Sequence, residues 1–380
     1  MGLFGPIRRR WQRFWWPTVS PGEFAGADTV AVIEWLTSAG GAEKVAAALV
    51  DVSDATAVCC LSERAEVTER LGISVPVHQS RVGSWAAEGR RWQYLLPIAP
   101  LLWGALDLSG ASNVVTSSHS LVNSVPAVGH RVCYCHTPVR YGWDWRMETE
   151  RVPRWLRPLF PVGAAALRAW DRHVAKRVDV FVANSTFVAD RIARAYDRTA
   201  VVVHPVIDTD WFVPNPDAIR TEFLVAGRFI PYKRVDLAIA AANQAKVPLV
   251  VAGAGPEGTR LRAMAGPTVR FVDSPSDDEM RTLLQRAVAL VHPGVEDFGM
   301  LVVEAQACGT PVIARAAGGA LDSVDPDRSG VLVSSDRVDD WAAALAEFAD
   351  PADSEARRRF ALQFGRDSFV DQINRVVGTS

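Results

Sequence analysis

Residues 287–314 read AVALVHPGVEDFGMLVVEAQACGTPVIA, and this stretch decides the fold class. It begins with an apolar run, turns at Phe298 and Gly299, and continues as an apolar helix before a second apolar run. That order predicts strand, loop, helix and strand. Two carboxylates, Glu296 and Glu304, flank the turn. Because open α/β sheets bind ligands where strand ends meet helix N-termini, we expect a ligand site here.

Strand and helix patterns alternate on both sides of this stretch. Such alternation predicts parallel sheets with helices on both faces. A Pro-rich break at 205–216 separates two series of similar rhythm, and the tail 354–377 has apolar positions typical of a helix. The predicted strands are 29–33, 113–116, 131–135, 178–183, 200–203, 221–226, 248–252, 269–272, 287–292, 311–314 and 330–333, with helices at 162–175 and 187–196.

The bulk composition is that of a globular protein of two or three domains, since the chain has 380 residues of which 49% are hydrophobic. A formal net charge of −2 gives no global attraction to nucleic acid. No apolar run approaches the ~20 residues of a membrane-spanning helix, and the N-terminus has no apolar signal core. Five cysteines without framework spacing fit a reducing compartment. We therefore expect a cytoplasmic protein.

Two cations follow the first strand of the second series. Arg228 stands at the C-terminal edge of that strand, and Lys233 follows near a helix start. Two cations at a strand end suit a diphosphate, although two solvated basic side chains would also explain them. The helix after Gly299 would add N–H groups that point toward phosphate oxygens. In such a site Glu304 would accept hydrogen bonds from ribose hydroxyls, and Glu296 from hydroxyls of an attached sugar.

These residues together resemble the retaining glycosyltransferases of family 4. The resemblance rests on Gly227-Arg228 with Lys233 and on 296–304 running into Gly309-Thr-Pro-Val. It extends over about residues 40–369 and includes Gly40-Gly41-Ala-Glu-Lys, Cys135-His136-Thr-Pro and Ala183-Asn-Ser. It implies the GT-B fold, in which two Rossmann-like domains face each other across a cleft and a C-terminal helix returns to the N-terminal domain.

Residues 1–27 stand apart by composition as a basic and aromatic N-terminal segment. The resemblance implies how the rest of the chain is divided, with 28–207 as an acceptor-binding Rossmann-like domain. Residues 208–362 form a nucleotide-sugar-binding Rossmann-like domain, and 363–380 the helix that crosses back to the N-terminal domain.

The resemblance then implies roles for single residues. Arg228 and Lys233 bind the diphosphate of the donor, Glu304 holds its ribose, and Glu296 contacts the sugar. His136 lies near the 6-hydroxyl of the sugar, although a histidine at a strand end is often structural. His136, Arg228, Lys233 and Glu296 are thus the implied catalytic residues. The implied donor-binding residues are Gly40, Gly41, Arg228, Lys233, Glu296, Phe298, Gly299, Met300, Leu301 and Glu304.

The segment His-Thr-Pro-Val-Arg-Tyr-Gly-Trp-Asp at 136–144, with Pro-Tyr-Lys-Arg at 231–234, resembles the bacterial mannosyltransferase branch that uses GDP-mannose. A UDP-sugar donor on the same fold is the alternative. The resemblance implies an acceptor, a glycan or a lipid-linked sugar, near Arg140, Tyr141, Trp143 and Asp144. Simple packing is the other interpretation of Trp143 and of Trp145. Cations and a helix dipole would supply the positive charge, so neither metal nor cofactor is expected.

Two other motifs favour different chemistry. Gly253-Ala-Gly255-Pro-Glu-Gly258 matches G-x-G-x-x-G, and Asp273 follows it at the spacing of a ribose-binding acid. Alone this indicates an NAD-linked oxidoreductase, but Pro256 has no N–H to offer a phosphate. Asp208-Thr-Asp210 resembles a metal clamp, although a turn is the simpler interpretation in a Pro-rich break. Cys133, Cys135 and His136 have no second ligand pair for zinc.

The N-terminal segment mixes arginines with Trp11, Phe14, Trp15 and Trp16, which suits the surface of an anionic membrane. A free end whose aromatic side chains pack on the domain is the other interpretation. A second basic stretch at 151–177 is either a solvated helix face or a surface for anionic lipid. Peripheral contact with a membrane therefore stays open. So does a non-enzymatic function, in which the protein only binds nucleotide sugars at the membrane.

Overall fold

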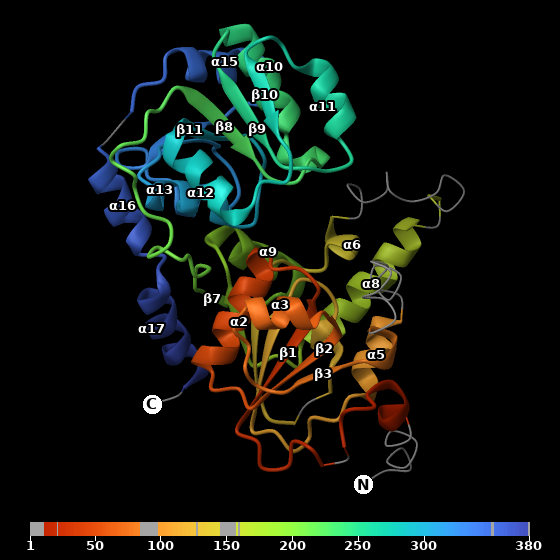
Figure 1. Ribbon diagram of the computed structural model, residues 1–380. Coiled ribbons are helices and arrows are strands. Elements are labelled where there is room, and N and C mark those ends of the chain that lie inside the picture. The colour runs from red at the N-terminus through yellow and green to blue at the C-terminus, as the bar shows by residue number, and fades with distance from the viewer. Residues whose placement is uncertain are drawn as a thin grey trace. The chain divides into compact units, whose positions relative to one another are not determined.

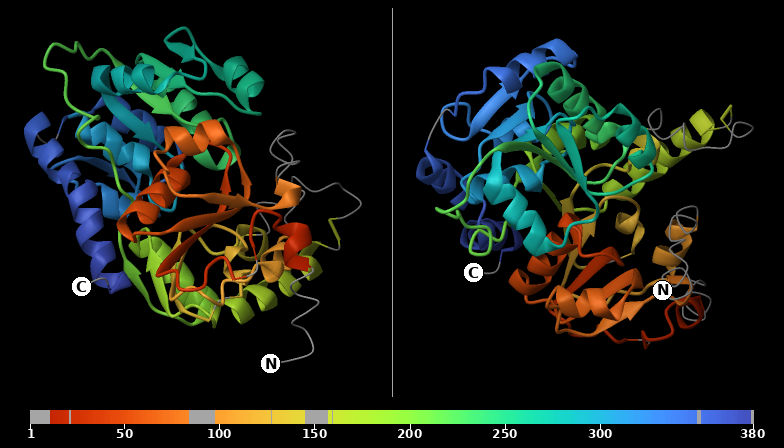
Figure 2. Two further views of the ribbon diagram at one scale, coloured as in Figure 1. Left: turned by 60° about the horizontal axis from the view of Figure 1, so that its bottom comes forward. Right: turned by 45° about the horizontal axis from the view of Figure 1, so that its top comes forward.

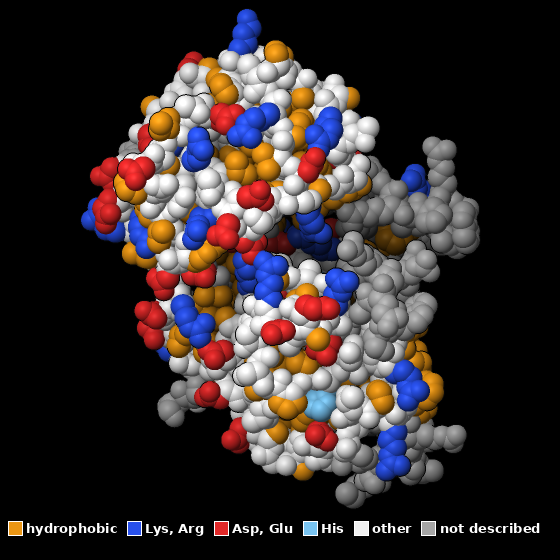
Figure 3. Space-filling model, in the orientation of Figure 1, with side chains coloured by type: hydrophobic (Ala, Val, Ile, Leu, Met, Phe, Trp, Pro, Cys, Tyr) orange, Lys and Arg blue, Asp and Glu red, His pale blue; other side chains and the backbone are white. Residues whose placement is uncertain are grey.

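The computed structural model describes residues 11–20, 22–83, 98–126, 128–144, 157–158, 160–350 and 353–378. The chain divides into two compact units (Figure 1). The first holds residues 1–203 and 370–380, and the second holds residues 204–369. These divisions fall at 203 and 369, where the sequence predicted 207 and 362. On the face shown in Figure 3, acidic and basic side chains are interspersed.

The sheet of the first unit has seven strands in the described residues, in the order β3-β2-β1-β4-β5-β6-β7. Every neighbouring pair is parallel. The order reverses between β1 and β4, which makes that point the topological switch point of the unit. The strands are β1 (Thr29–Leu36), β2 (Ala57–Glu63), β3 (Val77–Gln79), β4 (Asn113–Ser118), β5 (His130–Cys135), β6 (Val180–Ala183) and β7 (Ala200–Val202).

Alternating side chains of β1 explain why this sheet is buried on both faces. Val30 and Val32 belong to a cluster that contains helix α5, whereas Ala31 and Ile33 pack with helix α2. A parallel strand covered on both sides needs such continuous apolar sequence. The helices are α2 (Gly41–Val52), α3 (Ala65–Arg70), α5 (Ala99–Ala105), α6 (Arg140–Trp143), α8 (Phe160–Ala175) and α9 (Thr186–Tyr196), with the 3-10 turn η2 (Val122–Ser124).

The sheet of the second unit has six parallel strands in the described residues, in the order β10-β9-β8-β11-β12-β13. Its switch point lies between β8 and β11, and helices cover both faces (Figures 1 and 2). The strands are β8 (Glu222–Ala226), β9 (Leu249–Ala252), β10 (Val269–Val272), β11 (Ala287–His292), β12 (Val312–Arg315) and β13 (Gly330–Val333). The helices are η4 (Pro231–Lys233), α10 (Val235–Ala245), α11 (Gly258–Met264), α12 (Asp277–Arg286), α13 (Met300–Ala307), α14 (Ala320–Ser323), α15 (Val338–Ala346) and α16 (Ser354–Leu362).

Most predicted strands are present within a few residues of their predicted bounds, but three features differ. The tail 354–377 is not one helix, because it breaks after Leu362 into α16 and α17 (Arg366–Val377). At the break, the Gly365 N–H bonds to the carbonyl of Leu362, and buried Phe364 points into the core of the second unit. Strands β2 and β3 were not predicted. No helix in the described part of the chain is long and apolar enough to cross a membrane.

Candidate functional site

The switch point of the second unit brings together the two segments that the sequence singled out. The loop with Arg228 and Lys233 follows β8, and the loop with Glu296 follows β11, the neighbouring strand. Parallel strands end at the same edge of a sheet, so both loops emerge side by side there. The expected strand, loop, helix and strand order over 287–314 is confirmed by β11, α13 and β12.

Lys233 and Glu296 form a direct ion pair across this edge. Their side chains are only 16% and 20% exposed. The Lys233 side chain also runs beside Gly227, where a Cβ atom would lie 3.7 Å from Nζ. Gly227 has φ +136°, a conformation that side chains rarely adopt. The ammonium therefore has a fixed position at the end of β8.

His292, the last residue of β11, is a member of the site that the sequence did not predict. Its Nε2 lies 3.3 Å from Oε1 of Glu296, and its side chain is 6% exposed. Burial lowers the pKa of His292; the Glu296 carboxylate opposes that shift and the Lys233 ammonium adds to it. A neutral imidazole thus lies behind the ion pair. A polar residue at the carboxyl end of a buried strand was the feature of the sequence that could have identified His292 as a site residue.

The acidic loop rests on a glycine turn that sequence reasoning also missed. The Gly319 N–H donates to the carbonyl of Glu296 at 2.9 Å. A Cβ atom on Gly319 would lie 2.2 Å from Cα of Phe298, and one on Gly318 would lie 2.4 Å from the Glu296 carbonyl oxygen. Phe298 itself is buried, with its ring 5.4 Å from that of His204. Because Gly318 and Gly319 have no Cβ atom, the loop that carries Glu296 can pack directly against their backbone.

Helix α13 begins directly after this loop. Its N-cap, Gly299, has φ +90° and offers no side-chain cap to the first amides of the helix. N–H groups at such a start have no partner within the helix, and the helix dipole makes them attractive to anions. Met300 and Leu301 pack partly on the core, and Glu304 lies half-buried one turn further. These features suit a phosphate beside the helix start.

Arg228 is exposed, and its carbonyl accepts a hydrogen bond from the N–H of Ile230 at 2.9 Å. It lies on the same loop as Lys233, one residue after the tightly turned Gly227. The structure therefore places both predicted cations on one loop, and only Lys233 in the ion pair with Glu296.

The G-x-G-x-x-G motif has a packing explanation. A Cβ atom on Gly253 would lie 2.0 Å from the carbonyl oxygen of Gly227, and one on Gly255 would lie 2.6 Å from that of Phe229. Both glycines let the loop after β9 approach the loop after β8. Asp273, the expected ribose ligand of a dinucleotide site, pairs with Arg262 on the surface. This arrangement does not favour an NAD-linked oxidoreductase.

Asp208-Thr-Asp210, whose spacing resembles a metal clamp, forms a turn. Asp208 accepts a hydrogen bond from the N–H of Trp211 at 3.0 Å. Cys133 and Cys135 are buried, and Nδ2 of Asn123 donates to the Cys133 sulfur at 3.3 Å. Within the part of the chain that the structure describes, no three His, Cys, Asp or Glu side chains gather closely enough to hold a metal ion.

The first unit has its own polar cluster at its switch point. Buried Glu34, near the end of β1, accepts hydrogen bonds from the N–H groups of His119 and Val122, at 3.3 and 3.1 Å. Nδ1 of His119 lies 3.1 Å from the same carboxylate. The predicted residue His136 follows β5, and its Nε2 lies 2.9 Å from the Ser117 hydroxyl. The rings of His119 and His136 are 6.2 Å apart.

This cluster predicts a pH dependence of stability. Burial raises the pKa of Glu34 to about 8 and lowers the pKa values of His119 and His136 to about 3 and 4. Above pH ~6.5 both histidines are neutral in the folded chain, but the unfolded chain loses its histidine protons only by pH ~7.5, and this loss raises stability as pH rises. Between pH ~6.5 and ~8 only the folded protein still binds the Glu34 proton, so the Glu34 contribution to stability falls as pH rises and outweighs the opposing histidine contribution above pH ~7.5.

Glu34→Gln removes that proton and should flatten the fall, which is at most about 2 kcal/mol over this window. Urea unfolding of both proteins at the two ends of the window measures the slope. A slope that persists in the variant would assign the pH dependence to another group. The comparison uses the slope because Gln replaces one hydrogen-bond acceptor and lowers stability at every pH.

Gly40 and Gly41 lie where β1 leads into α2, as the sequence predicted. Gly40 is the N-cap, and a Cβ atom there would lie 2.8 Å from Oε2 of Glu43. The other oxygen of Glu43 accepts a hydrogen bond from the Ser38 hydroxyl at 3.1 Å. A glycine therefore leaves space for a buried carboxylate at this helix start.

Trp143 and Asp144, two of the predicted acceptor residues, make specific contacts within the first unit. Nε1 of Trp143 donates to buried Asp171 at 2.8 Å, and Arg172 lies over the Trp143 ring at 4.8 Å. Asp144 pairs with Arg191. These contacts favour the packing interpretation of Trp143, and the acceptor role stays a prediction. Arg140 and Tyr141 both lie half-buried within α6, and Tyr141 packs against the core of the first unit. Trp145 lies outside the described residues.

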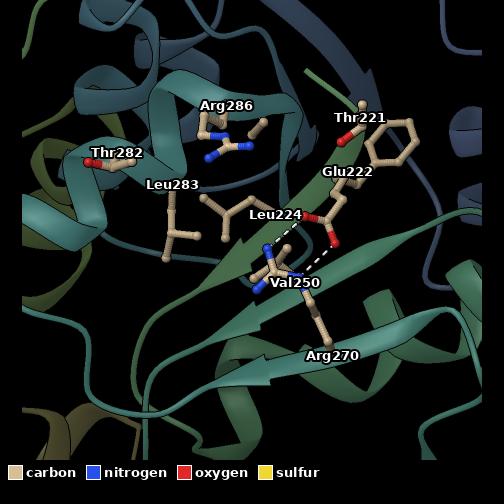
Figure 4. Close-up of a pocket in the computed structure, with 10 residues that line it drawn as sticks. Thr221, Glu222, Leu224, Val250, Arg270, Thr282, Leu283 and Arg286 are labelled. Carbon is tan, nitrogen blue, oxygen red and sulfur yellow. Dashed lines mark hydrogen bonds and ion pairs between the residues drawn. The ribbon is translucent and has the colours of Figure 1, made fainter. Parts of the chain in front are cut away.

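A small cavity of about 160 Å³ in the second unit lies at the opposite edge of the sheet (Figure 4). Glu222, the first residue of β8, pairs there with Arg270. Ala287, the first residue of β11, also lines it. Ligands of open α/β sheets bind at the carboxyl ends of the strands, so this cavity is not a candidate for the site.

The comparisons with known proteins show which proteins the chain resembles. Residues 207–362 match the family described as glycosyl transferases group 1. The D-inositol 3-phosphate glycosyltransferase of Mycolicibacterium smegmatis is 35% identical over an alignment of 233 residues, and the match covers 53% of this chain and 53% of that protein. Its counterpart in Mycobacterium avium is 37% identical over an alignment of 201 residues, and the match covers 45% and 47% of the two chains. The chain thus spans about half the length of the curated relatives it matches.

Solved structures match over nearly the whole chain. Sucrose-phosphate synthase from Thermosynechococcus elongatus has a TM-score of 0.70 and 18% identity, and the match covers 93% of this chain and 98% of that one. HepE from Anabaena, solved with UDP and glucose, has a TM-score of 0.68 and 17% identity, over 93% and 100%. The chain therefore has the GT-B fold, and its residues 207–362 match the glycosyl transferases group 1.

Proposed function

We propose that this protein transfers a hexose from a nucleoside diphosphate sugar to a hydroxyl group of a glycan or glycolipid, with retention at the anomeric carbon. One observation carries the proposal. The Lys233–Glu296 pair lies beside the start of α13, where the amides have no side-chain cap, at the switch point of the unit that matches the glycosyl transferases group 1.

In the proposed reaction the bond between the sugar and the diphosphate breaks, and negative charge develops on the leaving phosphate. Lys233, Arg228 and the amides at the start of α13 stabilise that charge electrostatically. Glu296 binds sugar hydroxyls and Glu304 binds the ribose. The acceptor hydroxyl attacks the same face, and its proton passes to the leaving phosphate.

The first unit is proposed to supply groups for the sugar and the acceptor. His136 is held by Ser117 and, through its carbonyl, by Nδ2 of Asn184 at 3.1 Å. Burial keeps the pKa of His136 at about 4, so a neutral imidazole would meet a sugar hydroxyl. Arg140 and Tyr141, both in α6, are the proposed acceptor residues.

We propose GDP-mannose as the donor, because residues 136–144 and 231–234 resemble the GDP-mannose-dependent branch. A UDP-sugar is the second candidate, since HepE, of the same fold, was solved with UDP and glucose. The two differ only in base and sugar, so the diphosphate roles of Lys233 and Arg228 apply to both.

A thermal-shift panel of GDP-, UDP-, ADP- and dTDP-sugars tests the donor. At a concentration 100 times its Kd a ligand stabilises by about 2.7 kcal/mol, which raises Tm by roughly 5 °C or more in a unit of this size. We expect GDP-mannose to give the largest rise. If a UDP-sugar raises Tm and no GDP-sugar does, the proposed donor changes from GDP-mannose to that UDP-sugar. The proposed diphosphate site stays the same.

NADH in the same panel tests the oxidoreductase alternative, and release of GDP from GDP-mannose with an acceptor mannoside tests turnover. The anomeric configuration of the product, read by NMR, tests retention. Binding of GDP-mannose without turnover on any acceptor class would favour a nucleotide-sugar-binding protein instead.

A further inference from the structure

One tryptophan, Trp16, directly follows the N-terminal helical segment, residues 11–15, and fixes it to the first unit. Trp16 is fully buried, and its Nε1 donates to the carbonyl of Leu102 at 2.9 Å. Its ring centre lies 5.4 Å from that of Trp103. Leu102 and Trp103 both belong to α5, so the segment and this helix lie against each other. The interpretation of a free end with packed aromatics holds for Trp16.

The same two segments expose large apolar side chains beside that buried anchor. Trp11 and Phe14 are 46% and 52% exposed, and Ile98 and Leu101, at the start of α5, are 37% and 63% exposed. Single exposed apolar residues are ordinary, whereas a group on adjacent segments marks an interaction surface. Figure 3 shows hydrophobic and basic side chains together over this region, at the lower right.

An open cavity of about 440 Å³ lies in this surface. Three aromatic and two guanidinium side chains line it, and no carboxylate is among these lining residues: Trp11, Arg13, Phe14, Trp15 and Arg81. The Arg81 guanidinium lies 5.1 Å from the centre of the Phe14 ring. Aromatic walls accept an apolar chain, and paired guanidinium groups accept a phosphate ester.

We propose that this surface docks the protein on a membrane that contains anionic phospholipid, with a lipid phosphate between Arg13 and Arg81. The composition carries the choice of partner. Tryptophan with arginine is the combination that binds at the boundary of headgroups and acyl chains, where rings enter the apolar layer and cations meet anionic lipid. An acidic protein would match the cations but leave four exposed apolar side chains without a partner.

The basic stretch at 151–177 is a weaker lipid surface. Arg168 donates to the carbonyl of Gly142 at 2.9 Å, and Arg172 donates to that of Ala195 at 2.9 Å. Both cations thus serve the packing of α8 within the unit. Residues 151–156 lie outside the described residues. Trp170 is exposed on α8, and Trp11 is exposed on the N-terminal segment. Vesicle binding by variants of these two residues shows which of the two surfaces meets the lipid.

Co-sedimentation with vesicles tests the proposal on the full chain. We expect binding to phosphatidylcholine vesicles that include phosphatidylglycerol, little binding to phosphatidylcholine alone, and weaker binding as salt is added. A basic residue near such a surface contributes about 1 kcal/mol, or about 5-fold in affinity, so Arg13→Ala with Arg81→Ala should weaken binding roughly 25-fold. Trp11→Ala with Phe14→Ala should also abolish most of it.

Matched controls are Trp170→Ala and Arg328→Ala, exposed side chains outside the proposed surface, which should bind as the unchanged protein does. A Trp11→Phe variant should keep binding but lose part of the tryptophan quenching by brominated lipid. Thermal unfolding checks that each variant folds. The proposal is overturned if anionic vesicles do not bind the unchanged protein, if neutral vesicles bind it equally, or if Trp170→Ala loses binding as Trp11→Ala with Phe14→Ala does. The test needs no catalysis, so it stands apart from the proposed transfer reaction.

Discussion

Replacing Lys233 by alanine should lower the turnover of the donor by roughly 100- to 1000-fold, the range found when one preorganised group that stabilises developing charge is removed. The ammonium lies at the end of β8, is mostly buried, and pairs with Glu296. The variant loses a cation beside the proposed phosphate and leaves the Glu296 carboxylate without that partner. Steady-state rates with GDP-mannose, or with whichever donor the thermal panel identifies, measure the loss.

Lys246→Ala is the matched control. Lys246 is an exposed lysine at the end of α10 in the same unit, so its removal changes the net charge equally without touching the site. We expect it to keep the rate of the unchanged protein. A Lys233→Ala enzyme that also keeps this rate would remove Lys233 from the proposed mechanism, as would a loss of equal size in Lys246→Ala.

The double variant separates two causes of the loss. In Lys233→Ala, part of the effect comes from the Glu296 charge, which now repels the diphosphate. In a Glu296→Gln background that repulsion is absent, so removing Lys233 should cost less than it does alone. Additive losses would mean that the two side chains act on separate parts of the donor. Glu296→Gln alone with an unchanged rate would remove Glu296 from the site.

The parts of the fold and the site that the sequence predicted are those with strong local patterns. The continuous apolar runs of β8 and β11 were readable, and the motif around them identified Lys233 and Glu296 although they are 63 positions apart. β3 was not readable, because three residues give too few repeats to detect a period. The run Ala57–Glu63 was a signal that the prediction did not use.

The missed members of the two polar clusters depend on three-dimensional contacts. His292 and Glu34 occupy strand positions, and a strand pattern does not show whether a polar side chain there meets a partner. Their partners come from other segments: Lys233 lies near His292, and the amides of 119 and 122 bind Glu34. The role of Gly319 likewise exists only because the loop at 296–298 rests on it.

Gly319→Ala should therefore reduce donor turnover by about 100-fold although residue 319 has no side chain to offer a substrate. The new Cβ atom would lie 2.2 Å from Cα of Phe298 and 2.5 Å from the carbonyl oxygen of Asp297. Both contacts are with backbone, so the loop must move, and Glu296 moves with it. A displacement of about 1 Å in a positioning element is enough for a loss of this size. Rates and donor-induced thermal shifts measure it.

Gly258→Ala is the control for this substitution. A Cβ atom on Gly258 would meet its nearest neighbour, the ring of Phe229, at 3.7 Å, an ordinary contact. It should keep both the rate and the donor response. If Gly319→Ala keeps them as well, the loop yields without moving Glu296, and the glycine turn has no part in placing the acid. If Gly319→Ala loses the donor response while Tm without donor stays close to that of Gly258→Ala, the loss lies in the geometry of the loop and not in global unfolding. That result would assign the position of Glu296 to the turn at Gly318 and Gly319.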